Sequence, residues 1–284
     1  MKTKLLLLSA FLILVFYGCK DNMFCIKGEG DLVDENRTIS NFSKVDMSIV
    51  GNIFLKQSDS TLVTISAEEN LIGEIKTEII GSTLVIKSRK CLSPNQPINI
   101  YIFVPQLDEI KNSGKGNIMS IENWDFASDV TFNLTGEGQI NFSNFTCNGD
   151  IEANVVGSGD IDLEHFTAKT LNTKITGTGD ITANDVSGIS SIVNNITGQG
   201  NIYVASTDTL ETNEINITGN GNVNEFEVIS NKVDVDISGT GNVYVTALKN
   251  LNVSVSGIGD IYYKGSPQVV SDISGVGKIN DVGK

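Results

Sequence analysis

A five-residue motif recurs nine times in this 284-residue chain: Gly-x-Gly, a polar residue, then Ile or Val. Successive copies are 22, 21, 20, 21, 21, 20, 18 and 18 residues apart. A unit this short cannot bury its own apolar face, so it must stack on its neighbours. The copies begin at Gly114, Gly136, Gly157, Gly177, Gly198, Gly219, Gly239, Gly257 and Gly275.

The segments between the motifs alternate apolar and polar residues, which is the period of a half-buried strand. VDVDIS at 233–238 and LNVSVS at 251–256 are examples. A propeller blade needs roughly 40 residues, about twice the repeat found here. Helical repeats need a 3.6-residue period, which these alternating segments do not have. We therefore predict an all-β fold: a right-handed parallel β-helix, or β-solenoid, with coils of about 20 residues.

The motif itself is read most simply as a corner of the coil. A dinucleotide loop needs a third glycine leading into a helix, but Thr182 stands there in ITGTGDITAN (175–184). A calcium β-roll repeats every nine residues, about half the period here. We expect no cofactor and no metal, a loose surface calcium being the alternative. Ile175 and Ile181 should face inward and Asp180 should face water.

The N-terminus has the pattern of an export signal. MKTK is basic, LLLLSAFLILVFYG is apolar, and VFYGC resembles a bacterial lipobox. We predict a lipoprotein signal peptide at 1–18, lipidation of Cys19 and a tether at 19–27. Cys25, Cys91 and Cys147 remain. Export permits a disulfide, and Cys25–Cys91 is conceivable, but the pairing cannot be read from sequence.

The rest of the chain is predicted to form one continuous domain. Residues 28–113 lack the regular glycines and should form a β region that caps the solenoid 114–284, with a short helical turn within 67–79. At the other end Lys278 replaces the usual Asn or Asp. Either this lysine discourages edge pairing, or this end docks on a copy of itself.

Charge and composition exclude several functions. A net charge of −14 argues against nucleic acid and against binding to an anionic lipid surface. The chain has two arginines and one histidine, His165, which reads as a surface turn residue. Asp234 and Asp236 alternate with inward valines and so should point to solvent. We therefore do not expect an enzyme.

Tyr203, Tyr244 and Tyr262 each follow directly after the Ile or Val of a motif. They should face outward on one side of the rod, where aromatic side chains can stack on sugar rings. Cross-strand packing on the surface is the alternative. These three residues are the candidate ligand-stacking surface.

The segment ENRTISNFSKVDMSIVGNIFLKQSDS, followed by LVTISAEENL, GSTLVIKS and PINIYIFVPQLDEIKNSGKGNI, resembles the putative auto-transporter adhesin, head GIN domain family. The landmarks include Arg37, Phe42 and Val104-Pro105, and the resemblance covers about residues 26–280. It implies a β-helix-like fold in an exported, often lipid-anchored protein of Gram-negative bacteria. The family name suggests adhesion, and no catalytic or binding residues come with it.

The function expected from these features is that of a non-catalytic, adhesin-like module that binds a glycan or protein. It would be lipid-anchored in the cell envelope, at the outer membrane, with the periplasmic or external face left open. A ligand-free structural envelope protein and a polysaccharide hydrolase or lyase are the alternatives. A homo-oligomer is a further option that the sequence leaves open.

Overall fold

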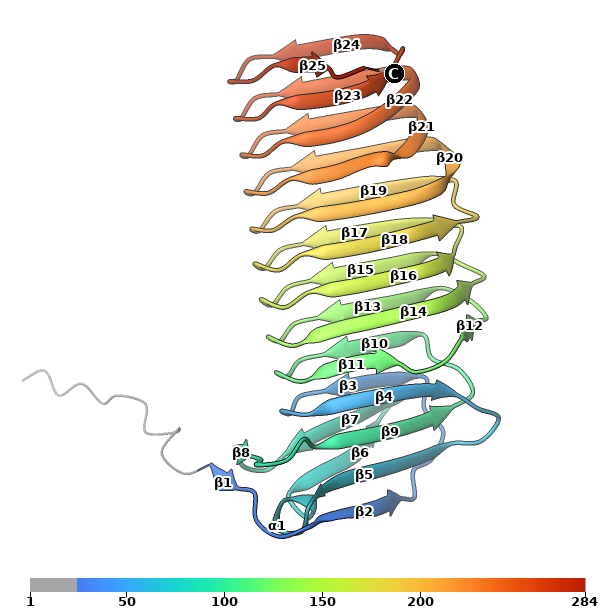
Figure 1. Cartoon of the computed structure of the whole chain (residues 1–284), viewed down its shortest axis with the longest axis vertical. Coiled ribbons are helices and arrows are strands. Elements are labelled where there is room, and N and C mark those ends of the chain that lie inside the picture. The colour runs from blue at the N-terminus through green and yellow to red at the C-terminus, as the bar shows by residue number, and fades with distance from the viewer. Residues whose placement is uncertain (1–24, 284) are drawn as a thin grey trace, which may run out of the picture.

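The computed structural model describes residues 25–283, so the predicted signal peptide and Cys19 lie outside the described residues. The chain forms a rod of stacked coils, with β24 and β25 at one end and β2 and β5 at the other (Figure 1). The predicted β-solenoid is confirmed. No helix in the described part is long and apolar enough to cross a membrane.

Each coil consists of two strands joined by the glycine corner. In one coil, β17 (Thr170–Ile175) leads into the corner and β18 (Ile181–Ser187) leaves it. Strands before the corner pair in parallel with their counterparts in the next coil, and strands after the corner do the same, so the rod has two walls. The other regular strands are β10 (Glu109–Asn112), β11 (Asn117–Ser120), β12 (Trp124–Phe126), β13 (Val130–Leu134), β14 (Gln139–Cys147), β15 (Ile151–Val155), β16 (Ile161–Thr167) and β19 (Ser191–Ile196).

Each coil also turns a second time, from the strand that leaves the glycine corner to the strand that enters the next one. Three long strands continue through this second turn and so contribute to both walls: β20 (Ile202–Ile217), β21 (Val223–Ile237) and β22 (Val243–Val255). The last coil follows with β23 (Ile261–Gly265), β24 (Gln268–Ile273) and β25 (Ile279–Asp281). β24 pairs with β22, and β25 pairs with β23.

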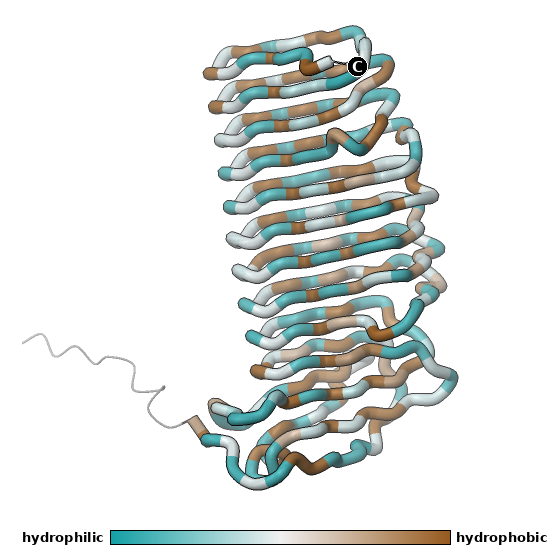
Figure 2. The backbone as a smooth tube through the Cα atoms, viewed as in Figure 1, coloured by the Kyte–Doolittle hydropathy of each residue, from teal (hydrophilic) through white to brown (hydrophobic). Residues whose placement is uncertain are grey.

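The core runs the length of the rod between the two walls. Hydrophobic and hydrophilic residues alternate along the strands (Figure 2), as the sequence predicted. Ile175 and Ile181 are fully buried, whereas Asp180 is exposed. Near the N-terminal end the core contains large aromatic side chains, including Trp124 and Phe142. Hydrophobic burial on both walls is therefore the main source of stability.

The corner glycines allow the coils to approach each other closely. A Cβ atom on Gly179 would lie 1.7 Å from the carbonyl oxygen of Gly159, and one on Gly177 would lie 1.9 Å from that of Gly157. Neither Gly177 nor Gly179 has a positive φ, so close backbone contact rather than an unusual backbone conformation requires glycine here.

The polar residue after most corners links one coil to the next. The Asp180 carboxylate accepts a hydrogen bond from the backbone N–H of Asn201 at 2.6 Å, and the Asn201 side-chain oxygen accepts one from Asn222 at 3.2 Å. The series continues through Asn242 to Asp260, which accepts from the backbone N–H of Lys278 at 2.8 Å. The position requires a side-chain oxygen, which both Asn and Asp provide.

The parallel coils begin before the first glycine motif. β3 (Lys44–Met47) and β4 (Asn52–Gln57) pair in register with β10 and β11, so the predicted boundary at residue 114 falls inside a coil. In this coil Ile49 stands opposite Gly114 and takes the place of the first glycine. A further coil lies below it, in which β7 (Thr83–Ser88) pairs with β3 and β9 (Asn99–Val104) pairs with β4. The segment 89–98 joins β7 to β9 instead of a tight corner.

Antiparallel strands close the N-terminal end. β2 (Leu32–Arg37) pairs with β5 (Leu62–Glu68), which pairs with β9, and β6 (Ile75–Ile80) pairs with β7. α1 (Glu69–Ile72) is the short helical turn predicted within 67–79. The antiparallel strands replace the missing coil beneath the first parallel one, so this end of the core is covered.

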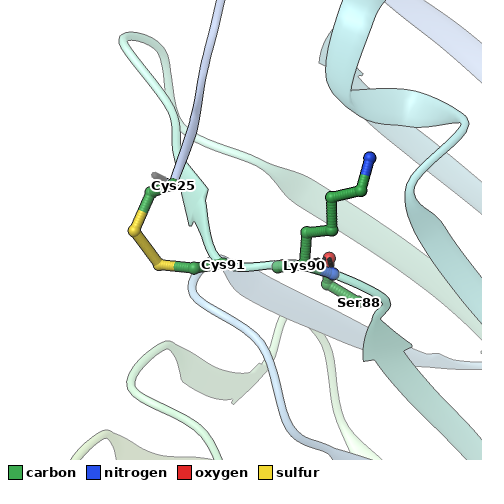
Figure 3. Close-up of a disulfide and its surroundings, with 4 residues drawn as sticks. All are labelled: Cys25, Ser88, Lys90 and Cys91. Atoms are coloured by element: carbon green, nitrogen blue, oxygen red, sulfur yellow. Dashed lines mark hydrogen bonds between the residues drawn. A yellow bond between two sulfur atoms is a disulfide. The ribbon is translucent and has the colours of Figure 1, made fainter. Parts of the chain in front are cut away.

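A disulfide joins the start of the described chain to this cap. Cys25 and Cys91 are bonded, and they hold β1 (Ile26–Lys27) parallel to β8 (Leu92–Ser93) (Figure 3). Cys147 is a free thiol, and burial raises its pKa, so the thiolate form is disfavoured. Of the pairings that the sequence left open, Cys25–Cys91 is the one formed.

We predict that Gly179→Ala destabilises the rod by about 3 kcal/mol or more, because the added methyl group meets the Gly159 carbonyl oxygen. Gly73→Ala is the matched control. Gly73 has φ −71°, and nothing lies within 4 Å of its added Cβ, so this change should be neutral or stabilise by up to about 1 kcal/mol. Denaturant unfolding of both variants tests the contrast, and equal stabilities would contradict it.

Candidate functional site

The three candidate tyrosines lie in one outward column of the wall formed by the strands that leave the corner. Tyr203 is in register with Asn224, Asn224 with Tyr244, and Tyr244 with Tyr262. All three tyrosines are half-buried. Because Asn224 occupies the coil between them, Tyr203 lies two coils, or about 10 Å, from Tyr244. The structure therefore brings together only two of the three.

Tyr244 and Tyr262 belong to a cluster with two residues that the sequence analysis did not find. The tyrosine rings are stacked, 4.9 Å apart and 8° from parallel, and Phe226 packs edge-on against Tyr244 at 5.3 Å. The Lys264 ammonium lies 4.4 Å from the centre of the Phe226 ring, within range of a cation–π interaction. Phe226, Tyr244, Tyr262 and Lys264 are called the aromatic cluster below.

Phe226 escaped the sequence analysis because it sits where the register between β21 and β22 shifts, after Glu225. It follows no repeated offset from its motif, so the nine-copy alignment offers no signal for it. Lys264 could have been found. It lies two residues after Tyr262, and residues two apart in a strand share a face.

The geometry of the aromatic cluster limits the chemistry it can offer. Tyr244 and Tyr262 each give one ring face to the other, so sugar stacking must use the remaining face of Tyr262 or the ring edges. Partial burial and the nearby Asp260 carboxylate raise the pKa of Tyr262, and burial with Glu227 raises that of Tyr203. Both phenols therefore stay protonated at neutral pH, and the Tyr262 hydroxyl donates a hydrogen bond to Asp260 at 3.4 Å.

The same outward column carries a second aromatic pair at the N-terminal end. Phe54 and Tyr101 stack at 5.1 Å, with their ring planes 17° apart. Register places Phe54 opposite Met119, and the column continues through Asn141, Asp162 and Thr182 to Tyr203. Stacked aromatic pairs thus stand near both ends of the column, with Met119, Tyr203 and polar residues between them.

A surface groove of about 720 Å³ lies beside the disulfide. It opens where the loop 89–98 stands away from the glycine corners of the first coils. Its basic residues are largely neutralised: Lys90 pairs with Glu74 at 3.2 Å and Lys115 with Glu137 at 2.9 Å. The groove thus follows from the loop that replaces a tight corner, and two of its three cations already have acidic partners.

The one histidine of the chain lies on the surface beside a carboxylate. His165 Nδ1 lies 2.8 Å from an Asp185 carboxylate oxygen, and both side chains are more than half exposed. Both residues have a positive φ and occupy equivalent positions in successive coils. His165 is on the surface, as the sequence suggested, but it lies within β16 rather than in a turn. Among the described residues no three His, Cys, Asp or Glu side chains are grouped to hold a metal.

One carboxylate is strongly perturbed, but it lies in the core. Glu225 is fully buried, and its oxygens accept hydrogen bonds from the side-chain amides of Asn194 at 2.9 Å and Asn213 at 2.6 Å. Burial raises its pKa to about 7, while the two amides lower it. Thr173 completes the network by donating to Asn194 at 2.7 Å. With no exposed surface, Glu225 is a structural group rather than a site for a ligand.

A family model described as putative auto-transporter adhesin, head GIN domain, matches residues 41–267. No curated protein matches the chain.

Solved structures from two Parabacteroides species share the fold over most of the chain. A putative lipid binding protein from Parabacteroides distasonis is 23% identical, with a TM-score of 0.64, and covers 91% of this chain and 100% of its own. A putative adhesin from the same species is 20% identical, with a TM-score of 0.66 and the same coverage. A putative adhesin from Parabacteroides merdae is also 20% identical, with a TM-score of 0.57, and covers 90% of this chain and 98% of its own.

Glu225 should make stability fall as pH rises. Its folded pKa of about 7 lies above the ordinary value of 4.5, so the native state holds a proton that the unfolded chain releases between these values. We expect this group to cost about 3 kcal/mol of stability between pH 4.5 and pH 8.

Glu225→Gln should remove that contribution, as measured by denaturant unfolding at the two pH values. The exposed Glu211→Gln is the control and should keep the pH dependence of the unmodified chain. If Glu225→Gln and the unmodified chain had the same pH dependence of stability, Glu225 would have the same pKa in the folded and the unfolded chain, contrary to the prediction.

Proposed function

The chain belongs to the putative auto-transporter adhesin, head GIN domain family, and from this membership we propose that it is a non-catalytic, adhesin-like binding protein of the cell envelope. Its ligand would be an extracellular glycan or protein. A lipid on Cys19 would hold it at the outer membrane, facing the cell exterior. The rod would then serve to carry a binding surface away from the membrane.

The observation that carries the binding proposal is the aromatic cluster on the outer wall. Phe226, Tyr244, Tyr262 and Lys264 combine apolar ring surface, phenol hydroxyls and one cation on a flat, rigid sheet. Aromatic rings with a polar tip are the residues that dominate protein recognition surfaces. Rigid strands also lose little conformational freedom when a ligand binds.

The distribution of charge supports an upright rod. Residues 26–115 contain ten Lys and Arg against twelve Asp and Glu, whereas residues 116–284 contain seven against twenty-one. The coils far from the anchor are therefore strongly acidic, and anionic lipid headgroups would repel them. The Cys25–Cys91 disulfide fixes the tether to the less acidic, capped end. Cys25 is only six positions beyond Cys19, a reach of about 20 Å at most.

Binding is tested with soluble residues 20–284 on a broad array of glycans and extracellular-matrix proteins. We predict that Tyr244→Ala with Tyr262→Ala lowers retention of the best ligand by at least ~10-fold, because two adjacent anchors are lost. Phe54→Ala with Tyr101→Ala removes an equivalent stacked pair near the capped end and should leave binding unchanged. Absence of any ligand across the array would favour a structural envelope protein.

The anchor is tested separately in cells. We predict that labelled palmitate is incorporated into the full chain and that Cys19→Ala abolishes the label and releases the protein from the membrane fraction. Cys147→Ala is the control, since that thiol is buried and should carry no lipid. Membrane retention of Cys19→Ala would refute the anchor without affecting the binding proposal.

A further inference from the structure

The last coil exposes the positions that every earlier coil buries. Val269 and Ile273 are each 38% exposed, whereas their register partners Leu251 and Val255 in β22 are at most 1% exposed. Within the described residues β24 and β25 are paired along one edge only. Apolar side chains and a free backbone edge together make a surface that favours strand pairing.

The rim of this end is also apolar. The middle residue of the glycine corner is polar or charged in the first seven motif copies, but it is Ile258 and Val276 in the last two, at 57% and 68% exposed. Val270 on the outer face of β24 is 56% exposed. Among the nine motif copies, only the last two have an apolar middle residue; the corner at 49–51, which lacks the first glycine, also has one in Val50.

We propose that this end face, formed by β24 and β25 and called the terminal face below, binds the terminal face of a second copy of the chain. Residues 266–283 carry only Asp272, Lys278 and Asp281, so this face has a net charge of −1 in a chain of net −14. Two copies therefore meet with little repulsion at this end, whereas side-by-side contact would oppose the acidic walls.

The pairing is antiparallel and closed. The opposite end of the rod is covered by β2, β5 and β6, so head-to-tail stacking of copies into a filament is blocked. A twofold axis instead places like strand edges against each other in opposite directions. Lys278 fits this arrangement. A further parallel coil would need a side-chain oxygen at this position to continue the hydrogen bonds between corners, and Lys278 has none. An antiparallel partner does not need that oxygen.

The area of the terminal face indicates a weak contact. Six residues of strand span about 20 Å, and the two walls, about 10 Å apart, span a similar width when their side chains are included. The terminal face of each copy is therefore about 400 Å², and roughly 800 Å² is buried over both copies. Stable specific complexes bury about 1,200–2,000 Å². A single contact is thus transient, but many contacts between two coated surfaces add up through avidity.

This inference rests on the proposed anchored adhesin, because a tether at the capped end leaves the terminal face pointing away from the membrane. Copies anchored on two facing cells would then meet end to end and hold the cells together. The partner that this face recognises is a second copy of the chain, on a surface distinct from the aromatic cluster.

The test uses beads that carry residues 20–284 attached through the N-terminus, together with sedimentation velocity over a range of concentrations. The unmodified chain should aggregate the beads and show a concentration-dependent dimer. Val269→Lys with Ile273→Lys should reduce bead aggregation and dimer affinity by at least ~10-fold. Beads attached through the C-terminus should not aggregate, because the terminal face is then blocked.

Ile121→Lys with Val156→Lys is the matched control: it adds the same charge at residues that are 44% and 56% exposed, away from the terminal face. It should behave as the unmodified chain, and circular dichroism confirms that both variants fold. A chain that stays monomeric and leaves the beads dispersed would overturn the inference, as would equal loss in both double variants. Ligand binding on the array is scored independently, so failure of the adhesin proposal is recognised separately.

Discussion

Each coil of the rod rests on the previous one through the backbone of two glycines. The α-carbons of Gly177 and Gly179 lie so close to the carbonyl oxygens of Gly157 and Gly159 that no side chain fits between them. This contact keeps every corner in the same place, which keeps both walls in register and the inward side chains in continuous columns. The core, the outward column and the two ends of the rod all follow from that register.

The last coil at each end of a stack has no neighbour on one side, so its core-facing residues must be covered in some other way. The two ends of this rod differ in how far they are covered. At the N-terminal end, antiparallel strands, a short helix and the Cys25–Cys91 disulfide cover the core. At the other end the inward residues of the last coil remain exposed. The two ends of the rod therefore differ in structure and in charge, and this difference supports the proposal that the protein is anchored at one end.

Register also determines what the surface can bind. Because every coil contributes one residue to each outward column, a binding surface arises only where neighbouring coils carry suitable residues. Tyr244 and Tyr262 satisfy this condition, while Asn224 separates them from Tyr203. Fully buried polar groups such as Glu225 serve the interior instead, where amide partners from two strands satisfy the carboxylate. A perturbed carboxylate is thus no guide to function in this fold.

The sequence by itself determined the solenoid, its coil length, the inward position of Ile181 and the exposure of Asp180. Each of these follows from a pattern that can be read within one repeat and that recurs nine times along the chain. The sequence also placed a short helical turn within 67–79, where the structure has α1 at Glu69–Ile72. Only the tertiary structure decided which cysteines pair, that Phe226 joins Tyr244, that Ile49 stands in a glycine position, and that inward positions of the last described coil are exposed. These depend on contacts between residues far apart in sequence and on a register shift in β21, neither of which leaves a periodic trace.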